Sequence, residues 1–223
     1  MKITSFLLAA ISAIVLCAGV VNATKPYRGE LDWQFQQTTQ EFELGAFDSI
    51  SVSGVVDVTF RQSDSYRVVV RAYESLFGSL ELGIQDGTLS LIAHNDSEPA
   101  IELYVYAPSL AAATLSGAVS AFGWDTISGD RFRLSVSGMA EAEIDFDVRN
   151  LAVDASDMAN LSLLGTAQFF IARMSGMTNL DASDLVATNI IVNASYMANV
   201  VVYVSYRLRS SSHGMAQVHV LGL

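Results

Sequence analysis

The sequence contains little cysteine, lysine or histidine, and each shortage excludes a kind of chemistry. Among 223 residues the only cysteine is Cys17, which lies in an apolar leader, so the rest of the chain can form no disulfide, thiolate nucleophile or cysteine-based metal site. Lysine occurs only at Lys2 and Lys25, and the formal net charge is −11. So acidic a chain repels phosphate backbones and anionic lipid headgroups, which argues against nucleic acid and membrane surfaces as partners.

Residues 1–23 have the features of a signal peptide: Lys2 precedes an apolar core, and Val21-Asn22-Ala23 is a small-residue cleavage site. We therefore expect a protein exported through this signal peptide, whose location is periplasmic, outer-surface or secreted. The apolar core is shorter than the ~20 residues that a membrane span needs, so no span is expected after cleavage. Lipid attachment at Cys17 is the alternative, disfavoured because Leu16 precedes it.

The strongest pattern in the chain is a recurring tripeptide. Its copies are Ser53-Gly54-Val55, Ser116-Gly117-Ala118, Ser137-Gly138-Met139, Ser156-Asp157-Met158, Ser175-Gly176-Met177, Ser195-Tyr196-Met197 and His213-Gly214-Met215. The methionines of the last five copies are 19, 19, 20 and 18 residues apart. A fixed period of this length is typical of coils that bury their apolar faces only against neighbouring coils. The central glycine suits a corner with left-handed backbone, which Asp157 also tolerates and Tyr196 tolerates less well.

Apolar residues alternate with polar ones on both sides of each copy, which predicts strands with one face inward. Residues seven, five and three before each methionine, and three and five after it, form apolar columns; a weaker column nine after contains Val148, Ala167 and Val186. We expect an all-β fold: a short right-handed parallel β-helix, or β-solenoid, with coils of about 19–20 residues, two strands per coil and an N-terminal β-sheet cap. A lone coil could not fold, because ordering ~20 residues costs on the order of 20 to 40 kcal/mol.

The region after the first tripeptide breaks the period. Tyr66–Tyr73, Thr88–Ala93 and Ile101–Tyr106 are β-rich runs joined by turn signals such as Asp86-Gly87. We expect them to form a small sheet that caps the open end of the stack and prevents polymerisation through exposed strand edges. The predicted organisation is a signal peptide (1–23), a lead segment (24–44) and a single domain (45–223), divided into a first coil with its flanking sheet (45–108) and regular coils (109–223).

The order of these parts resembles a bacterial family known as the putative auto-transporter adhesin, head GIN domain family. The matching stretches are Phe47–Gly54, Asp86–Leu91, Ala107–Leu110 and Leu115–Ala118, followed by the Ser-Gly coils, so that the likeness covers roughly residues 42 to 223. The resemblance implies a β-helix-like fold in an exported bacterial protein and supplies no catalytic residues. The sequence departs from the family by placing Met after Gly, where the family has small residues.

Two sets of polar residues are candidates for catalysis. A row of serines (Ser137, Ser156, Ser175 and Ser195) has only His213 in the same column as a possible base, so we expect these hydroxyls to bond backbone groups. Six aspartates (Asp145, Asp147, Asp154, Asp157, Asp181 and Asp184) lie on neighbouring coils and could pair for general acid/base cleavage of a polysaccharide, with Arg149 and Arg173 near. We favour a solvated acidic face; a weak divalent-cation site is a further alternative.

Three other columns or clusters have a structural and a binding interpretation. The methionine column suits soft copper, but without His or Cys beside it we expect the methionines to fill gaps in the interior. Trp33, Trp124, Tyr104 and Tyr106 are either a sugar-binding platform or core and cap residues. Glu141, Asn160, Asn179, Asn199 and Gln217 follow the corners, where stacked amides can hydrogen-bond from coil to coil.

The sequence therefore predicts no catalytic, cofactor-binding or metal-ligating residue and no cofactor. The residues singled out are those of the structural repeat: Gly54, Gly117, Gly138, Met139, Met158, Gly176, Met177, Met197, Gly214 and Met215. The predicted function is that of a non-catalytic exported cell-envelope protein, an adhesin or binding module that acts through the exposed faces of the solenoid. Its expected partner is a cell-surface glycan or an envelope protein, and the alternative function is a polysaccharide-acting enzyme that uses the aspartates.

Overall fold

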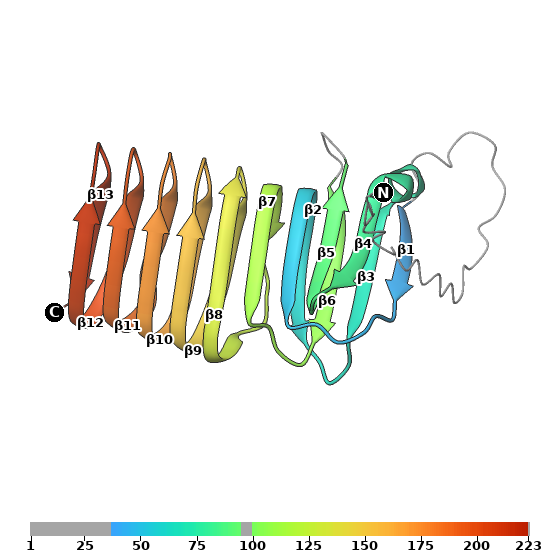
Figure 1. Ribbon diagram of the computed structural model, residues 1–223, viewed down its shortest axis with the longest axis horizontal. Coiled ribbons are helices and arrows are strands. Elements are labelled where there is room, and N and C mark those ends of the chain that lie inside the picture. The colour runs from blue at the N-terminus through green and yellow to red at the C-terminus, as the bar shows by residue number, and fades with distance from the viewer. Residues whose placement is uncertain (1–36, 95–99, 223) are drawn as a thin grey trace, which may run out of the picture.

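The computed structural model describes residues 37–94 and 100–222, most of which lie in β-strands (Figure 1). The elements are β1 (Gln37–Phe42), β2 (Ser49–Gln62), β3 (Arg67–Tyr73), η2 (Glu74–Ser79), β4 (Leu80–Gln85), β5 (Thr88–Ala93), β6 (Ile101–Ala107), β7 (Ala112–Ala121), β8 (Ile127–Gly138), β9 (Glu141–Ala155), β10 (Asn160–Met174), β11 (Asn179–Ala194), β12 (Asn199–Ser212) and β13 (Gln217–Gly222). They form a β-solenoid of about 6 turns, so the predicted fold class is confirmed. The predicted signal peptide lies outside the described residues.

Each regular coil is one long strand that bends once. In β10, Leu161 and Leu163 before the bend and Phe170 and Ala172 after it are buried, while two adjacent exposed residues, Gln168-Phe169, interrupt the alternation at the bend. We call the part before the bend the first limb and the part after it the second limb. The two strands predicted for each coil are these two limbs, which enclose a dry shaft between them.

Consecutive coils stack in parallel and in register. Val153 pairs with Ala172, and Ala172 pairs with Val192, so residues one coil apart lie directly over one another. Backbone groups are satisfied between coils at a spacing of about 4.8 Å, and each inward residue packs on its counterparts above and below. The inward columns are therefore those predicted, with exceptions in β11, described next, and in the last coil, where Ser210 and Ser212 occupy inward positions and are exposed.

The coil that contains β11 carries one extra residue, and this overturns one expected position. The register moves from Ala182 opposite Val202 to Val186 opposite Tyr203, so residues are skipped on the β11 side. A bulge of this kind reverses which residues face inward. Leu185 is consequently buried and Val186 is exposed, whereas the sequence period had placed Val186 inside.

At the N-terminal end the spatial order of strands differs from their order in the chain. Strand β2 pairs in parallel with β7 on one side, and on its other side with β5 through Ser49–Ser53 and with β6 through Val56–Gln62. Strands β5 and β6, which were expected in a flanking sheet, thus form a further parallel rung of the solenoid. Leu91 and Leu103 extend the buried shaft through this rung.

Antiparallel strands close this end of the stack. Strand β4 pairs with β5, β3 pairs with β6, and β1 lies outermost on β3, as Figure 1 shows beside the blue-green end of the ribbon. The change from parallel to antiparallel pairing stops the solenoid period and covers the backbone edges of β5 and β6. The predicted N-terminal cap is therefore present, and it consists of β1, β3 and β4.

The turn that joins one coil to the next requires a left-handed residue. Gly117, Gly138, Gly176 and Gly214 have φ between 75° and 89°. A Cβ on Gly176 would lie 2.6 Å from the carbonyl oxygen of Asp157 in the preceding coil, so glycine avoids a collision as well as strain. Asp157 is itself left-handed, and its carboxylate accepts a hydrogen bond from the Gly138 N–H at 3.1 Å. For Tyr196, with φ of 62°, the described residues offer no such compensating hydrogen bond.

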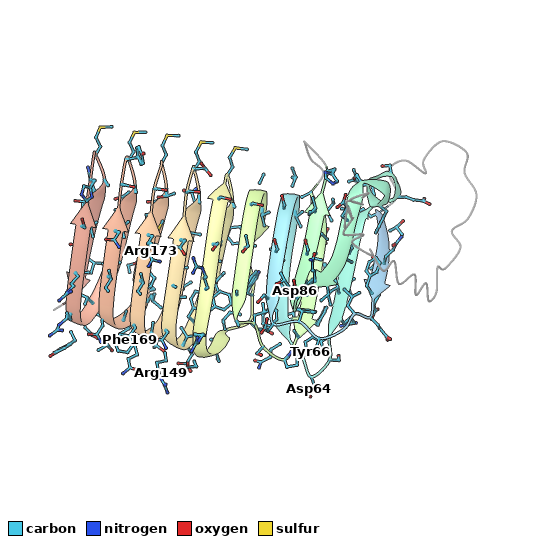
Figure 2. All side chains as sticks on the ribbon, in the orientation of Figure 1. Asp64, Tyr66, Asp86, Arg149, Phe169 and Arg173 are labelled. Atoms are coloured by element: carbon cyan, nitrogen blue, oxygen red, sulfur yellow. The ribbon has the colours of Figure 1, made fainter. Side chains whose placement is uncertain are left out.

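The methionines that follow these turn residues lie on the surface, so the prediction that they fill the interior is wrong. Met139, Met158, Met177, Met197 and Met215 are 44 to 71% exposed. Figure 2 shows sulfur atoms at the tips of the successive turns. The reason is parity: the inward columns stand at odd offsets from each methionine, which places the methionine itself on the outward face. The following residue, such as Ala140 or Ala159, is buried instead.

Candidate functional site

The outward face of the second limbs is hollowed into a shallow groove beside the turns. The groove has a volume of about 570 Å³ and runs across several coils. It is lined by Thr114, Ser135, Val136, Ser137, Asp154, Ala155, Ser156, Arg173, Met174, Ser175, Asn193, Ala194, Ser195, Ser211 and His213. Because the coils are in register, equivalent outward residues line up in rows along the solenoid axis.

The row nearest the turns consists of Ser137, Ser156, Ser175, Ser195 and His213, which we call the hydroxyl row. The Ser195 hydroxyl donates to the Met174 carbonyl at 3.3 Å, and the Ser156 hydroxyl donates to Asp157 at 3.1 Å. Ser195 thus bonds the backbone, as predicted, and not His213. The row presents polar groups to a ligand along the axis, without the base that an activated serine needs.

Arginines gather on this same face. Of the chain's 12 basic residues two are lysines, which leaves ten arginines. Arg133, Arg173 and Arg209 occupy outward positions of second limbs, and Arg131, Arg149 and Arg207 lie at the bend. We call this surface, with these six residues, the arginine face. It is locally basic although the chain as a whole is acidic.

Asp154 is the acidic residue at the centre of the arginine face, and it is held between two arginines. Its carboxylate accepts from Arg133 at 2.7 Å and from Arg173 at 3.1 Å, so one aspartate bridges three successive coils. Asp130 forms a second pair with Arg149 at 2.9 Å. In the described part of the chain Arg209 has no ion-pair partner, and its charge is available to a ligand.

The fold places Asp154 on a different limb from most of the aspartates expected to pair for catalysis. Asp154 stands opposite Ser135 and Arg173, so neither paired position in the neighbouring coils carries a carboxylate. Asp145 and Asp184 lie in first limbs, each opposite Leu164, and are therefore two coils apart. Asp145, Asp147, Asp181 and Asp184 lie on first limbs, Asp154 on a second limb and Asp157 in a turn. Within residues 37–94 and 100–222 no three His, Cys, Asp or Glu side chains group as a metal site.

The first limbs carry most of the remaining acidic residues of the solenoid. Their outward side chains include Glu141, Glu143, Asp145, Asp147, Asp181 and Asp184. Asp145 accepts a hydrogen bond from Thr126 at 2.9 Å and Asp147 accepts one from Thr166 at 3.0 Å, so both carboxylates are fixed by coil-to-coil contacts. This is the solvated acidic face that the sequence analysis favoured. The solenoid is therefore divided into an acidic face and the arginine face.

An apolar strip crosses the arginine face. Ala152, Ile171 and Ile191 stand in register between Arg133 at one end and Arg209 at the other. Phe169, which is 44% exposed, lies in the adjacent row, and Figure 2 shows it with Arg149 at the bend edge. Four coil spacings of about 4.8 Å separate the two arginine ends by about 19 Å. A second hollow of about 230 Å³ lies over this strip.

Trp124 belongs to the core and not to a sugar-binding platform. Its side chain is 8% exposed, and its ring lies 6.1 Å from that of Phe60. The indole N–H donates to the Val58 carbonyl at 2.9 Å, which satisfies its only polar atom. Trp33, the other tryptophan considered, lies outside the described residues.

Tyr104 and Tyr106 are engaged within the N-terminal rung. The Tyr104 hydroxyl donates to Glu102 at 2.8 Å, and this hydrogen bond, with a contribution from burial, raises the pKa of Tyr104 above its usual range. The ring of Tyr106 lies 4.0 Å beneath the Arg67 guanidinium. Both aromatic residues thus have intramolecular partners, which favours a structural role in the N-terminal rung over a sugar-binding platform.

The polar column after the turns forms part of the expected ladder. The Asn199 side-chain amide donates to the Asn179 side-chain oxygen at 3.1 Å, and Asn160 donates to Glu141 at 3.5 Å. These bonds link neighbouring coils on the outside of the stack and therefore support the register.

The arginine face is the feature that sequence reasoning missed. From the sequence, only Arg149 and Arg173 were predicted to lie near a bound sugar, because only arginines close to the six aspartates were compared with them. The signal was present in the sequence: Arg133, Arg173 and Arg209 all fall at even offsets before a methionine, which the repeat places on the outward face.

Comparisons with known proteins agree on the fold. Residues 46–223 match the family described as "Putative auto-transporter adhesin, head GIN domain". A comparison with curated protein sequences gives no match. A solved "putative adhesin" from Bacteroides fragilis is 16% identical with a TM-score of 0.69, covering 85% of this chain and 98% of its own.

Two structures from Parabacteroides distasonis are also similar. One, a "Putative lipid binding protein", is 16% identical with a TM-score of 0.59 and covers 84% of this chain and 94% of its own. The other, a "putative adhesin", is 16% identical with a TM-score of 0.55 and the same coverages. At these identities the likeness shows a shared fold alone.

Proposed function

Because the chain belongs to the family described as "Putative auto-transporter adhesin, head GIN domain", we propose that it is a non-catalytic, exported binding module that attaches to an acidic cell-surface glycan through the arginine face. The observation that carries this proposal is the gathering of six of the ten arginines on one face of a chain whose net charge is −11. Such segregation of charge steers an anionic ligand to that face alone.

The chemistry of the groove suits a charged sugar chain. Arginine pairs with carboxylate or sulfate groups through two parallel hydrogen bonds, and Arg209, two residues before the groove-lining Ser211, is free to do so. Ser137, Ser156 and Ser175 present hydroxyls in a row parallel to the solenoid axis. The coil spacing of about 4.8 Å is close to the length of one sugar residue, so a linear glycan could meet one coil per residue.

The positions of the carboxylates favour binding over cleavage. Glycoside hydrolysis uses two carboxyl groups about 5 to 9.5 Å apart on opposite sides of the bond that breaks. Asp154, the carboxylate nearest the groove, is instead neutralised by Arg133 and Arg173. Export is supported by the signal-peptide features of residues 1–23 and by the family description.

A glycan array with the purified chain beginning at Thr24 tests the proposal. We expect retention on carboxylated or sulfated glycans that weakens as salt is raised, and loss of retention in the Arg207→Gln/Arg209→Gln variant. The matched control is Arg67→Gln/Arg71→Gln, which removes the same charge from the cap. Equal loss in both variants, or retention of neutral glycans alone, would contradict the assignment to the arginine face. Release of a shortened glycan by the unchanged protein would show an enzyme.

A second candidate ligand is an anionic lipid surface, which the apolar strip favours. Phe169 and Ile191 are exposed between the arginines, a combination that suits a headgroup layer with acyl chains beneath it. A structural neighbour named as a lipid-binding protein shares the fold. Co-sedimentation with vesicles that contain anionic lipid, compared with neutral vesicles, separates the two ligands, and Phe169→Ser should weaken only the lipid interaction.

A further inference from the structure

The five exposed methionines form a regular row along one edge of the solenoid. We call Met139, Met158, Met177, Met197 and Met215 the methionine edge. Each methionine N–H donates to the left-handed residue of the preceding coil, as Met177 does to the Asp157 carbonyl at 2.7 Å and Met197 to the Gly176 carbonyl at 2.9 Å. The backbones of the row are therefore locked in register, one coil apart.

This placement is not explained by packing. Methionine ordinarily fills gaps in a core, as Met174 does here at 1% exposure, whereas the edge methionines project from the turn tips (Figure 2). Thr178 and Ala198, one residue further on, take the inward positions and close the shaft beneath the row. The fold thus holds thioether sulfurs outward without needing them for its own core.

A row of thioethers has a specific chemistry. Neutral, polarisable sulfur ligands select soft monovalent ions such as Cu(I) over harder cations. If the zinc–sulfur bond of about 2.3 Å is taken as the scale for a metal–sulfur bond, a linear sulfur–metal–sulfur unit spans about 4.6 Å. Consecutive coils are about 4.8 Å apart. Two methionines in adjacent coils can therefore share one ion with almost no movement of the backbone.

We propose that the methionine edge binds soft monovalent metal ions, Cu(I) or Ag(I), between the sulfurs of methionines in successive coils. The long, unbranched side chains adjust to the ion while the hydrogen-bonded turns fix the spacing, so the second sulfur binds at a high effective concentration. The surrounding charge also favours a cation: Asp157 precedes Met158, Glu141 follows Met139 by two residues, and both are exposed.

The same row is a poor site for hard or borderline cations. Calcium needs six to eight oxygen ligands, and zinc sites use three or four His, Cys or carboxylate ligands. The described residues contain no cluster of three such side chains, on this edge or elsewhere. His213, two residues before Met215, is the one imidazole near the row and could supply a ligand at its last coil only.

Titration with Ag(I), which does not undergo redox exchange in air, tests the proposal directly. Isothermal titration calorimetry in chloride-free buffer gives the affinity, and NMR of ¹³C-methyl methionine shows which methyl groups respond. We expect the edge methyls to shift and the Met174 methyl to stay unchanged. The Met158→Leu/Met177→Leu/Met197→Leu variant keeps the apolar surface and should lower the affinity about 100-fold or more, the gain that a second linked ligand supplies.

Two controls decide the interpretation. Met174→Leu, a buried methionine outside the row, should leave Ag(I) binding unchanged. Zn(II) should bind at least about 100-fold more weakly than Ag(I), since thioethers prefer soft ions. The proposal is overturned if Ag(I) binds no tighter than it does to N-acetylmethionine amide, if the triple variant binds like the unchanged protein, or if His213→Ala alone abolishes binding.

Discussion

The middle coils and the last coil of this solenoid share one sequence pattern but differ in burial. In the column five residues before each methionine, Val153, Ala172 and Val192 are fully buried, whereas Ser210 at the equivalent position of the last coil is exposed. Leu208 is likewise only partly buried, although Phe170 and Ile190 in its column are buried. The positions are equivalent in the repeat, but the last coil has fewer neighbouring coils and carries serine where the middle coils carry valine or alanine.

The difference shows that the neighbouring coils create the interior. A coil position becomes dry when another coil covers it on each side, as expected for a stack in which each repeat contacts only its neighbours. At the N-terminal end antiparallel strands supply that cover, and at the last coil polar Ser210 and Ser212 lower the cost of doing without it. Polar residues at an exposed end also oppose association of strand edges.

The largest expected effect comes from placing a charge in one inward column at two positions, one in a middle coil and one in the last coil. Val192→Asp puts a carboxylate in the dry shaft without a partner and should lower the free energy of unfolding by about 4 kcal/mol or more. Ser210→Asp puts the same group at an exposed position, and surface changes of this kind are usually within about 0.5 kcal/mol. Chemical denaturation followed by circular dichroism measures both.

Similar losses in Val192→Asp and Ser210→Asp would mean that the last coil is covered in solution by a second molecule. Ser210→Ala provides the control for removing the hydroxyl, and we expect it to change stability little.

The turns provide a comparison of intermediate size. Gly176→Ala forces a left-handed alanine, at about 1 to 2 kcal/mol, and also brings its Cβ to 2.6 Å from the Asp157 carbonyl oxygen. Gly214→Ala in the last turn carries the same backbone strain, but its Cβ would meet the Tyr196 oxygen at 3.1 Å. We expect a drop in melting temperature for both variants and a larger drop for Gly176→Ala, by scanning calorimetry. A larger drop for Gly214→Ala would contradict this use of the turn geometry.

The sequence was sufficient for the coil architecture because stacking makes the information redundant. Every coil repeats the same alternation, so a single weak position such as Ala172 does not hide the column that contains it. Two features could not be predicted by counting residues along the repeat. The bulge in β11 shifts the register by local geometry. Strands β5 and β6 lie beside β2 although residues 63–87 and 63–100, respectively, intervene in the sequence.

The candidate site was less accessible to sequence reasoning. Arg133 and Arg209 share one surface only after five coils are stacked, and the bridge from Asp154 to Arg133 and Arg173 depends on the register of three neighbouring coils. For the methionines, the residue type led to the wrong prediction. Their hydrophobicity suggested burial, whereas the alternation within the same coil places them on the outside. Pattern and parity proved more informative here than hydrophobic character.

The smallest expected effect tests that distinction between column and edge. If Met177 lay in the shaft, Met177→Asp would be among the most damaging changes in the protein; at 52% exposure on the methionine edge it should alter the free energy of unfolding by only about 0.5 kcal/mol. Met215→Asp in the last coil should have an equally small effect, because the methionine edge is exposed in every coil. Buried Met174→Asp supplies the contrast, since that side chain is 1% exposed and its replacement should be severely destabilising. Equal melting temperatures for Met177→Asp and Met215→Asp, together with a severe loss of stability in Met174→Asp, would confirm which residues face inward and which face outward. A large loss of stability in Met177→Asp would mean that the two faces are reversed.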